Sequence, residues 1–430
     1  MQTKLAPEFR NTADGTEAEA ILRKCVHCGF CTATCPTYQL LGDELDGPRG
    51  RIYLMKQVLE GEPVTRTTQL HLDRCLTCRN CETTCPSGVQ YGNLVEIGRR
   101  IVDARVERPA AEKAARWLLK EGLTSPLFAP AMKVGQALRP LLPQVLKNKV
   151  PAPAGARAHR WPIRVHARKV LMLMGCVQPA MMPNINSATA RVLDAAGIQT
   201  LVADEAGCCG AIRLHLNDHE GALADMRRNI DAWWPLVDGL TGQGQVERVV
   251  MNASGCGVTV KEYGHSLKDD PAYAAKARRI AALTVDLSEL LPDLVPLLQG
   301  KLALPRPAGE RGGGAPARPD VRMKRLAFHP PCTLQHGQQL HDAVETQLTA
   351  LGFEVQVARV ESHMCCGSAG TYSVLQPELA YALRDRKLAN LGELDPQVIV
   401  SANIGCIQHL QTGTTTSVRH WVEVLDDALA

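Results

Sequence analysis

The sequence predicts an α+β multidomain protein, in which an all-α amino-terminal domain precedes two α/β repeats with parallel sheets. Three observations lead to this prediction. Two cysteine-rich runs near the amino end are joined by a segment whose apolar residues have helical spacing. Two later regions alternate strand-like and helix-like segments in the same order. Two stretches rich in proline, glycine, alanine and arginine separate these three regions.

The linker-like stretches set the expected domain boundaries, and a length of 430 residues is typical of about three domains. We expect the all-α domain at residues 1–147, a linker at 148–168, the first repeat at 169–302, a second linker at 303–320 and the second repeat at 321–430. Hydrophobic residues make up 45% of the chain, which is enough for a buried core in each domain.

The composition narrows the classes of function. A net charge of +4 is too small to favour nucleic acid as a partner, and aromatic residues, at 4%, are too few for a surface that stacks bases. The sixteen cysteines favour metal sites over disulfides. The first residues lack the apolar segment of a signal peptide, and no apolar run reaches the ~18 residues that cross a bilayer. We therefore expect a cytosolic or peripheral protein in a reducing compartment.

The two cysteine-rich runs, KCVHCGFCTATCP and RCLTCRNCETTCP, both spell C-x2-C-x2-C-x3-C-P, which is the arrangement that holds a [4Fe–4S] cluster. Three thiolates spaced by two residues cover three corners of the cluster, so the fourth ligand comes from elsewhere. In two-cluster ferredoxins the last cysteine of each run ligates the other cluster. This rule assigns Cys25, Cys28, Cys31 and Cys85 to cluster 1, and Cys75, Cys78, Cys81 and Cys35 to cluster 2.

The alternative for these runs is a pair of four-cysteine zinc sites. Such sites usually combine two separated C-x2-C knuckles, whereas each run here places four cysteines within eleven residues. The cluster interpretation is therefore favoured. Two clusters in one small domain predict a conduit, in which electrons arrive at one cluster and leave through the other.

Helices are expected to hold the clusters. Residues 16–24 predict a helix capped by Asp14 or Thr16, and the stretch GPRGRIYLMKQVLEGE between the runs has helical spacing. Four arginines flank the runs, and we expect them to compensate cluster charge and tune its potential, with an ordinary solvated role as the alternative. These arginines are Arg49, Arg51, Arg74 and Arg79.

Residues 126–146 are unusually apolar and contain four prolines. We expect this segment to pack against the ferredoxin domain, with contact to a partner subunit or a membrane surface as alternatives. The prolines interrupt it too often for a span across a bilayer.

Each α/β repeat carries four cysteines in the same order. A strand ends in the first cysteine, a second strand leads to a Cys-Cys-Gly (CCG) triplet, and a third strand ends in the last cysteine. Parallel strands place these cysteines at the carboxyl edge of the sheet, where α/β proteins bind ligands. The expected metal ligands are Cys176, Cys208, Cys209 and Cys256 in the first repeat, and Cys332, Cys365, Cys366 and Cys406 in the second.

Adjacent side chains on a strand point to opposite faces, so the two thiols of a CCG triplet converge only where the strand has turned. Gly210 and Gly367 allow that turn, because glycine adopts backbone angles closed to other residues. The metal in each quartet is left open between an iron–sulfur cluster and zinc.

Four histidines lie near the cysteines of the second repeat. His409 follows the last cysteine by three residues and is a candidate ligand, with a packing role favoured. His329, His336 and His363 are candidates for hydrogen bonds to the ligands or for proton handling, with surface roles as the alternative.

A helical two-cluster ferredoxin joined to two CCG repeats resembles the family of iron–sulfur subunits that serve glycolate oxidase, L-lactate dehydrogenase complexes and anaerobic glycerol-3-phosphate dehydrogenase, together with the cysteine-rich subunit of heterodisulfide reductase. The stretches KCVHCGFCTATCPTY, DGPRGRIYLM, AGCCGA, HPPCTLQHGQ and CCGSAGTYS look most like the bacterial glycolate oxidase members. The resemblance implies a complex with FAD-containing flavoprotein subunits that oxidises glycolate to glyoxylate and passes electrons toward quinone. It also implies a cytoplasmic protein held peripherally at the inner membrane.

One departure from the family pattern stands out. The heterodisulfide reductase site has a further cysteine three residues after the last one, and this chain has Thr259 and His409 there. That difference puts in doubt whether either quartet holds the non-cubane cluster of that enzyme.

Three hypotheses for function follow. The chain lacks a G-x-G-x-x-G fingerprint after a strand, so the flavin that accepts two electrons is expected in another subunit and this chain is expected to be an electron carrier without catalytic residues of its own. In the second hypothesis the CCG repeats reduce a disulfide at a metal centre. In the third they form a zinc-stabilised docking scaffold, which metal analysis would distinguish from redox sites.

Overall fold

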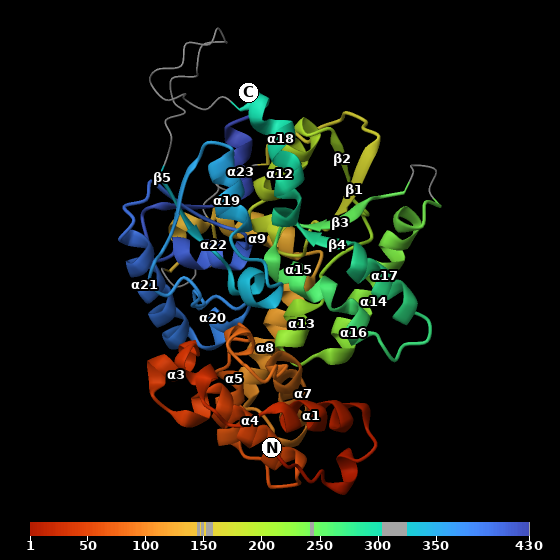
Figure 1. Ribbon diagram of the computed structural model, residues 1–430, viewed down its shortest axis with the longest axis vertical. Helices are drawn as coiled ribbons and strands as arrows, with labels where there is room; N and C mark the ends of the chain where they lie inside the picture. Colours follow the sequence, from red (N-terminus) through yellow and green to blue (C-terminus); the bar gives the residue numbers. More distant parts are fainter. Residues whose placement is uncertain (144–146, 148–149, 152–157, 241–244, 303–324, 430) are drawn as a thin grey trace.

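The computed structural model describes residues 1–143, 147, 150–151, 158–240, 245–302 and 325–429. In Figure 1 the amino-terminal helices form one lobe at the bottom, and the two CCG repeats lie side by side above it. The expected second linker, 303–320, lies outside the described residues, as do residues 148–149 and 152–157 of the first.

The amino-terminal lobe is built from helices, as predicted. Its helices are α1 (Ala13–Lys24), α2 (Phe30–Ala33), α3 (Pro36–Leu41), α4 (Pro48–Leu59), α5 (Arg66–Asp73), α6 (Asn80–Thr83) and α7 (Tyr91–Arg105). Two further helices, α8 (Ala110–Thr124) and α9 (Phe128–Ala137), lead from the lobe to the repeats. The cap of α1 is Thr12, whose side chain accepts a hydrogen bond from the Gly15 N–H, so the prediction of Asp14 or Thr16 was wrong. The cluster runs supply the short helices α2 and α6.

The first repeat forms a parallel sheet in the order β2-β1-β3-β4. The strands are β1 (Arg168–Met172), β2 (Ile198–Leu201), β3 (Arg248–Met251) and β4 (Thr284–Asp286). The helices are α11 (Gln178–Met181), α12 (Asn184–Ala195), α13 (Ala211–His215), α14 (His219–Val237), α15 (Ser254–Lys261), α16 (Tyr263–Ser266), α17 (Ala274–Leu283) and α18 (Leu291–Leu298).

The second repeat has the same topology, in the order β6-β5-β7-β8. The strands are β5 (Arg325–His329), β6 (Glu354–Val357), β7 (Val398–Ser401) and β8 (Ser417–His420). The helices are α19 (Ala343–Ala350), α20 (Tyr372–Leu375), α21 (Pro377–Gly392), α22 (Ile404–Gln411) and α23 (Trp421–Asp427), with a π-helical turn at Thr333–Gly337. All strand pairs are parallel, which confirms the predicted fold class.

Two details of the repeats differ from the sequence prediction. Each sheet has a fourth strand, β4 or β8, which was not predicted from the sequence. These strands have three and four residues, which is too short for a recognisable alternating pattern. The third strand of each repeat also ends before its cysteine, because Cys256 and Cys406 lie in the first turns of α15 and α22. The cysteines are therefore placed by the loops and helices that follow the strands.

The two repeats share one hydrophobic core. Val170 and Ile185 of the first repeat belong to the same buried cluster as Phe328 and Trp421 of the second. Helix α12 packs against α23 across this junction, as Figure 1 shows near the top of the molecule. Because apolar burial is shared, the two sheets are held in a fixed relation to each other.

The expectation that the apolar segment at residues 126–146 packs against the amino-terminal lobe was wrong for the part that the structure describes. Within its described part, helix α9 lies chiefly against α11 of the first repeat. Helix α8 connects the lobe to the first repeat. Its Arg116 pairs with Asp73 of α5, and its Glu121 pairs with Arg213 of α13. The segment therefore ties the lobe to the repeats. Among the described helices, none has the length and apolar character needed to cross a bilayer.

Gly367 offers a test of the CCG turn. It has a φ of +89°, and a Cβ there would lie 2.4 Å from the carbonyl oxygen of Ala380. We expect Gly367→Ala to destabilise the protein by about 2 kcal/mol or more, because the left-handed backbone and the contact both disfavour a side chain. The midpoint of thermal unfolding measures this loss.

The matched control is Gly392→Ala in helix α21, where a Cβ would meet no described atom within 4 Å. Alanine at that position is expected to leave stability unchanged or to raise it by up to about 1 kcal/mol. Equal unfolding midpoints for the two variants would contradict this account of the turn.

Candidate metal centres

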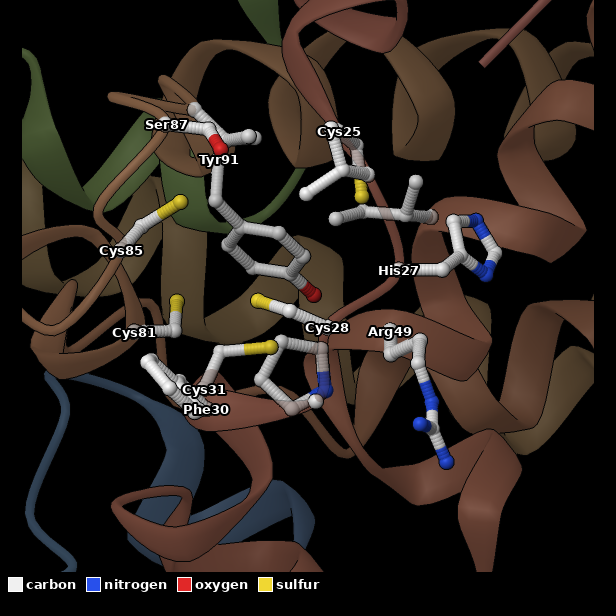
Figure 2. Close-up of a pocket in the computed structure, with 15 residues that line it drawn as sticks. Cys25, His27, Cys28, Phe30, Cys31, Arg49, Cys81, Cys85, Ser87 and Tyr91 are labelled. Atoms are coloured by element: carbon white, nitrogen blue, oxygen red, sulfur yellow. The ribbon is translucent and has the colours of Figure 1, made fainter.

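The four cysteines assigned to cluster 1 line one cavity. Cys25, Cys28, Cys31 and Cys85 line a space that opens to solvent, together with Tyr91 and with Cys81, which is assigned to cluster 2. Figure 2 shows these side chains around the Tyr91 ring. Cys85 reaches the cavity from the second run, so the structure brings the crossing cysteine to the other three.

The electrostatics of Cys31 reflect this grouping. Burial raises the pKa of Cys31 to about 11, and the neighbouring Cys25, Cys85 and Cys28 add to the rise. Thiolates packed this closely in a buried site repel one another, so a cationic group is needed to keep them ionised.

The cysteines assigned to cluster 2 also lie together. Burial raises the pKa of Cys81 well above its usual value, and Cys78, Cys75 and Cys35 act in the same direction. Cys35 comes from the first run, so this quartet also contains its crossing cysteine. Cys75 differs, because two buried arginines outweigh the effect of burial and lower its pKa.

The eight thiols of the two runs are not gathered as closely as the ligands of a single ion. Four ligands around one zinc ion lie about 3.8 Å apart, as follows from Zn–S bonds of about 2.3 Å in a tetrahedron. Within the part of the chain that the structure describes, no three of the eight thiols come within 4.8 Å of one another. The donor set is all sulfur and more widely spaced than one ion requires.

The flanking arginines have different roles. Arg51 is fully buried beside Cys75 and Cys35 and lies 3.4 Å from Asp46. Arg74 also pairs with Asp46, whereas Arg49 pairs with Glu44 and lies near Cys31. Arg79 pairs with Glu262 of the first repeat, so it joins the lobe to that repeat.

Sequence reasoning missed Arg99 on α7. Its buried guanidinium donates hydrogen bonds to the carbonyls of Leu72 and Cys75, and its charge helps to lower the pKa of Cys75. Arg99 follows Cys85 by 14 residues, on a helix whose orientation toward Cys75 depends on tertiary packing. Only a prediction of how α7 packs could have placed it.

The first CCG quartet forms a chain of neighbouring thiols. Hydrogen bonds from Cys176 and Cys209 lower the pKa of Cys208 to about 3. Hydrogen bonds with Cys208 and Cys256, together with burial, raise the pKa of Cys209 well above its usual value. The positive φ of Gly210, +97°, lets its N–H point back to the Cys208 sulfur at 3.4 Å. The predicted glycine turn is present.

The second CCG quartet has a parallel arrangement with a buried cation nearby. Cys332 and Cys365 have sulfurs 3.8 Å apart, and Cys366 contacts both Cys365 and Cys406. Lys387 on α21 is 3% exposed, and burial lowers its pKa to about 8 although these thiols raise it. This lysine was not identified from the sequence.

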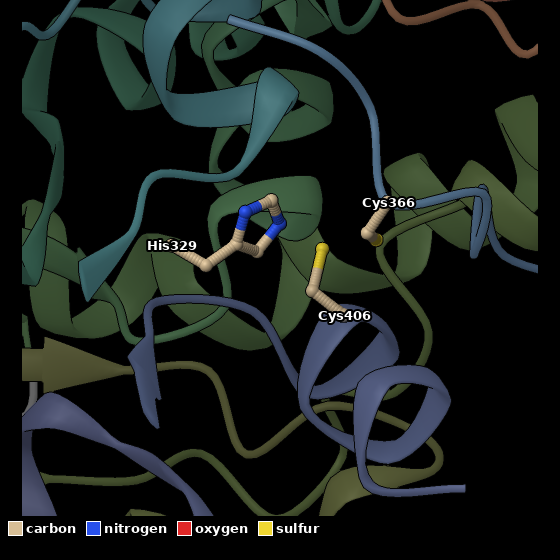
Figure 3. Close-up of side chains that lie close together, drawn as sticks. All are labelled: His329, Cys366 and Cys406. Atoms are coloured by element: carbon tan, nitrogen blue, oxygen red, sulfur yellow. The ribbon is translucent and has the colours of Figure 1, made fainter. Parts of the chain in front are cut away.

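The four candidate histidines separate into distinct roles. His409 bonds to the Ala380 carbonyl and stacks on Tyr381, in keeping with the favoured packing role. His336 bonds to Thr83 and to the carbonyl of His363. His329 lies beside Cys366 and Cys406, as Figure 3 shows. Burial lowers its pKa well below the usual value, so the ring is neutral.

Cluster 2 and the second CCG quartet adjoin each other. Cys78 and Leu76 share an apolar cluster with Cys332 and Cys365. Tyr372 donates a hydrogen bond to the Arg74 carbonyl across the same junction. Cys78, which is assigned to cluster 2, therefore lies near Cys332 and Cys365 of the second repeat.

Arg99 tests the electrostatic environment of cluster 2. One buried charge at an effective dielectric constant of about 20 is worth on the order of 2 kcal/mol at a separation of several ångströms, equivalent to about 100 mV. We expect Arg99→Gln to lower the reduction potential of one cluster by several tens of millivolts, measured by a redox titration followed by paramagnetic resonance.

Arg100→Gln is the matched control, since Arg100 is the next residue on α7 and pairs with Asp14 near the surface. Its potentials should equal those of the parent protein. A shift of the same size in both variants, or in neither, would contradict a specific effect of Arg99.

Two family models match the chain. Residues 21–89 match the family model of a 4Fe-4S dicluster domain, and residues 170–261 and 326–411 match that of a cysteine-rich domain. These matches support iron–sulfur cluster binding in the amino-terminal lobe and the two-repeat architecture of the remainder.

Two of the similar proteins cover nearly the whole chain, and a third covers part of it. The glycolate oxidase iron-sulfur subunit of Escherichia coli K12 is 54% identical over 100% of this chain and 99% of its own length. A probable glycolate oxidase iron-sulfur subunit of Bacillus subtilis 168 is 29% identical over 94% of this chain and 91% of its own. Lactate utilization protein A of Bacillus velezensis is 26% identical over 60% of this chain and 99% of its own. The chain therefore belongs to the family of glycolate oxidase iron–sulfur subunits.

Proposed function

We propose that this chain is the electron-transfer subunit of a membrane-associated glycolate oxidase complex. It accepts electrons from FAD-containing flavoprotein subunits through two [4Fe–4S] clusters and passes them toward quinone. The observation that carries the proposal is the pair of crossed cysteine quartets, one opening to solvent and the other touching the second CCG repeat.

The proposed ligands follow the crossing rule. Cys25, Cys28, Cys31 and Cys85 hold cluster 1, and Cys75, Cys78, Cys81 and Cys35 hold cluster 2. The domains are proposed as drawn from the sequence, with the ferredoxin domain ending near residue 147 and the CCG domains at 169–302 and 321–430. Each CCG domain offers four cysteines to a further metal centre.

Electrons are proposed to enter at cluster 1. Cys28 is exposed, and the apolar side chains of Val26 and Phe30 beside it are 69% and 61% exposed. Exposed apolar residues next to a redox centre suit the docking of a protein donor, because short distances favour electron transfer. We assign this surface to a flavoprotein subunit.

Electrons are proposed to leave through cluster 2. Its Cys78 lies against Cys332 and Cys365, so the second CCG domain is the next protein layer on the path toward quinone. The first CCG domain is joined to the lobe by Arg79 and Glu262 instead. This asymmetry gives the path a direction through the molecule.

The proposed roles of the flavin and of the clusters agree with the number of electrons that glycolate releases. Oxidation of glycolate to glyoxylate releases two electrons and two protons, which a flavin takes up together. Each [4Fe–4S] cluster accepts one electron at a time, so this chain separates the pair. No hydride acceptor is needed here, and no catalytic residue is assigned to this chain.

Glycolate is proposed as the substrate of the complex. Glycolate rests on the relatives' names, and the likeness to lactate utilization protein A makes L-lactate the second candidate. A catalytic CCG site of the heterodisulfide reductase kind is disfavoured, because Thr259 and His409 stand where that site has a cysteine. Reduction of the clusters by glycolate and by L-lactate, compared in the same complex, distinguishes the donors.

The deciding experiment uses the purified complex under anaerobic conditions. Glycolate should bleach the iron–sulfur absorption only when the flavoprotein subunits are present. Turnover of glycolate by this chain alone, with an artificial acceptor, would contradict the proposal. Failure of glycolate to reduce the clusters in the intact complex would also contradict it.

Phe30 tests the proposed entry surface. Truncating a central aromatic contact commonly costs 2 kcal/mol or more, which corresponds to roughly 30-fold in affinity. We expect Phe30→Ala to weaken flavoprotein binding by at least tenfold while leaving the iron content unchanged, as measured by titrating the rate of cluster reduction against flavoprotein.

Trp117→Ala on α8 is the matched control, since Trp117 is also 61% exposed but lies outside the cluster 1 surface. Its half-saturation should equal that of the parent protein. An unaltered half-saturation in Phe30→Ala would exclude this surface as the entry point.

A further inference from the structure

The second CCG domain contains a buried histidine without a hydrogen-bond partner. His329 ends strand β5 and is 1% exposed. Among the described residues, neither of its ring nitrogens has a hydrogen-bond partner. Burying an unsatisfied polar group is costly, and most buried polar groups in folded proteins are paired. A ligand or metal ion that binds a ring nitrogen of His329 would remove this cost.

The ring is aimed at two thiols. One ring nitrogen of His329 and the sulfurs of Cys366 and Cys406 all lie within 4.8 Å of one another. Figure 3 shows the ring beside the Cys406 sulfur, with Cys366 approaching from the other side. Zinc–ligand bonds of about 2.0–2.3 Å place neighbouring ligands roughly 3.5–3.8 Å apart, so only small movements would close the three around one ion.

Cys365 lies outside this group of three and is the adjacent candidate for a fourth ligand. Cys365 contacts Cys366, and its sulfur lies 3.8 Å from that of Cys332 on the side facing cluster 2. Cys366 and Cys406 instead belong to the apolar core shared by the two repeats. The quartet is therefore split between two environments, and only its inner half faces the histidine.

The fold itself does not require a histidine at this position. His329 precedes Cys332 by three residues, and the residue three before Cys176 in the first repeat is Leu173. Leu173 is buried in an ordinary apolar cluster. Since the two sheets have the same topology, an aliphatic residue would satisfy packing there, so the imidazole points to a chemical role.

We propose that His329, Cys366 and Cys406 bind a single Zn²⁺ ion, with Cys365 completing the tetrahedron. Neutral imidazole and thiolate are the donors that zinc prefers in structural sites. The ion joins β5, the CCG turn and α22, which are three segments that meet beside cluster 2. It fixes Cys365 against the cluster without taking part in electron transfer. In the described part of the first CCG domain, Leu173 stands at the position of His329, so that domain lacks this nitrogen ligand.

The amide of Asn403 supports this arrangement. Its Nδ2 lies 3.7 Å from the Cys406 sulfur, a contact that suits a thiolate. The Ser401 hydroxyl donates to the His329 carbonyl at 2.9 Å, which fixes the backbone from which the ring extends. Asn403 and Ser401 thus orient the ligands Cys406 and His329 without binding the metal themselves.

The test measures metal content and coordination in the full-length chain carrying its iron–sulfur clusters. The parent protein should contain one zinc per chain, with zinc-edge X-ray absorption showing one nitrogen and three sulfur ligands. His329→Gln should lower zinc affinity at least tenfold in a chelator competition, while iron content and the paramagnetic signals of the clusters stay unchanged. His329→Cys, which supplies another zinc ligand, should retain zinc.

His409→Gln is the matched control, since it is a buried histidine of the same domain that bonds to the Ala380 carbonyl. It should retain zinc at the parent level. Parent protein without zinc, or His329→Gln with unchanged zinc affinity, would overturn the proposal. Loss of iron together with zinc in both His329→Gln and His329→Cys would also overturn it, because the histidine would then support the fold or the clusters instead.

Discussion

The structure depends on keeping buried thiols ionised next to one another. Burial and neighbouring thiols raise the pKa of Cys31 and Cys81, so these quartets cannot remain thiolates without cationic charge at their centre. Iron supplies that charge in the proposed clusters, and Arg51 and Arg99 add to it beside Cys75. The short helices α2 and α6 hold the runs, while α4 and α7 carry the two arginines.

The relation between the lobe and the repeats follows from this arrangement. Clusters that transfer electrons must lie close to each other and to their partners. On the side of cluster 2, the junction of Cys78 with Cys332 and Cys365 brings the lobe close to the second repeat. On the side of cluster 1, the open space beside Phe30 leaves room for a partner to approach. The shared core of the two CCG repeats keeps this junction in place. The second repeat therefore contributes both a contact surface and, through His329, an anchor for it.

The sequence was most informative where chemistry requires fixed spacing. The cysteine runs and both CCG triplets predicted the sites and their grouping, and Gly210 and Gly367 predicted the turns. Strands β4 and β8 were too short to recognise, and the contact of α9 with α11 depends on tertiary packing that local patterns do not encode. Arg99 and Lys387 lie on helices whose orientation toward the thiols they influence depends on tertiary packing. His329 was noticed as a neighbour, but its missing partners were visible only in three dimensions.

The most direct measurement compares single-cysteine variants by paramagnetic resonance of the reduced protein. Cys28→Ser and Cys78→Ser each mark one cluster by altering its signal. If the last cysteine of each run crosses over, Cys35→Ser should alter the same signal as Cys78→Ser, and Cys85→Ser the same signal as Cys28→Ser. The opposite pairing, in which Cys35→Ser matches Cys28→Ser, would contradict the crossed arrangement on which this account of the molecule rests.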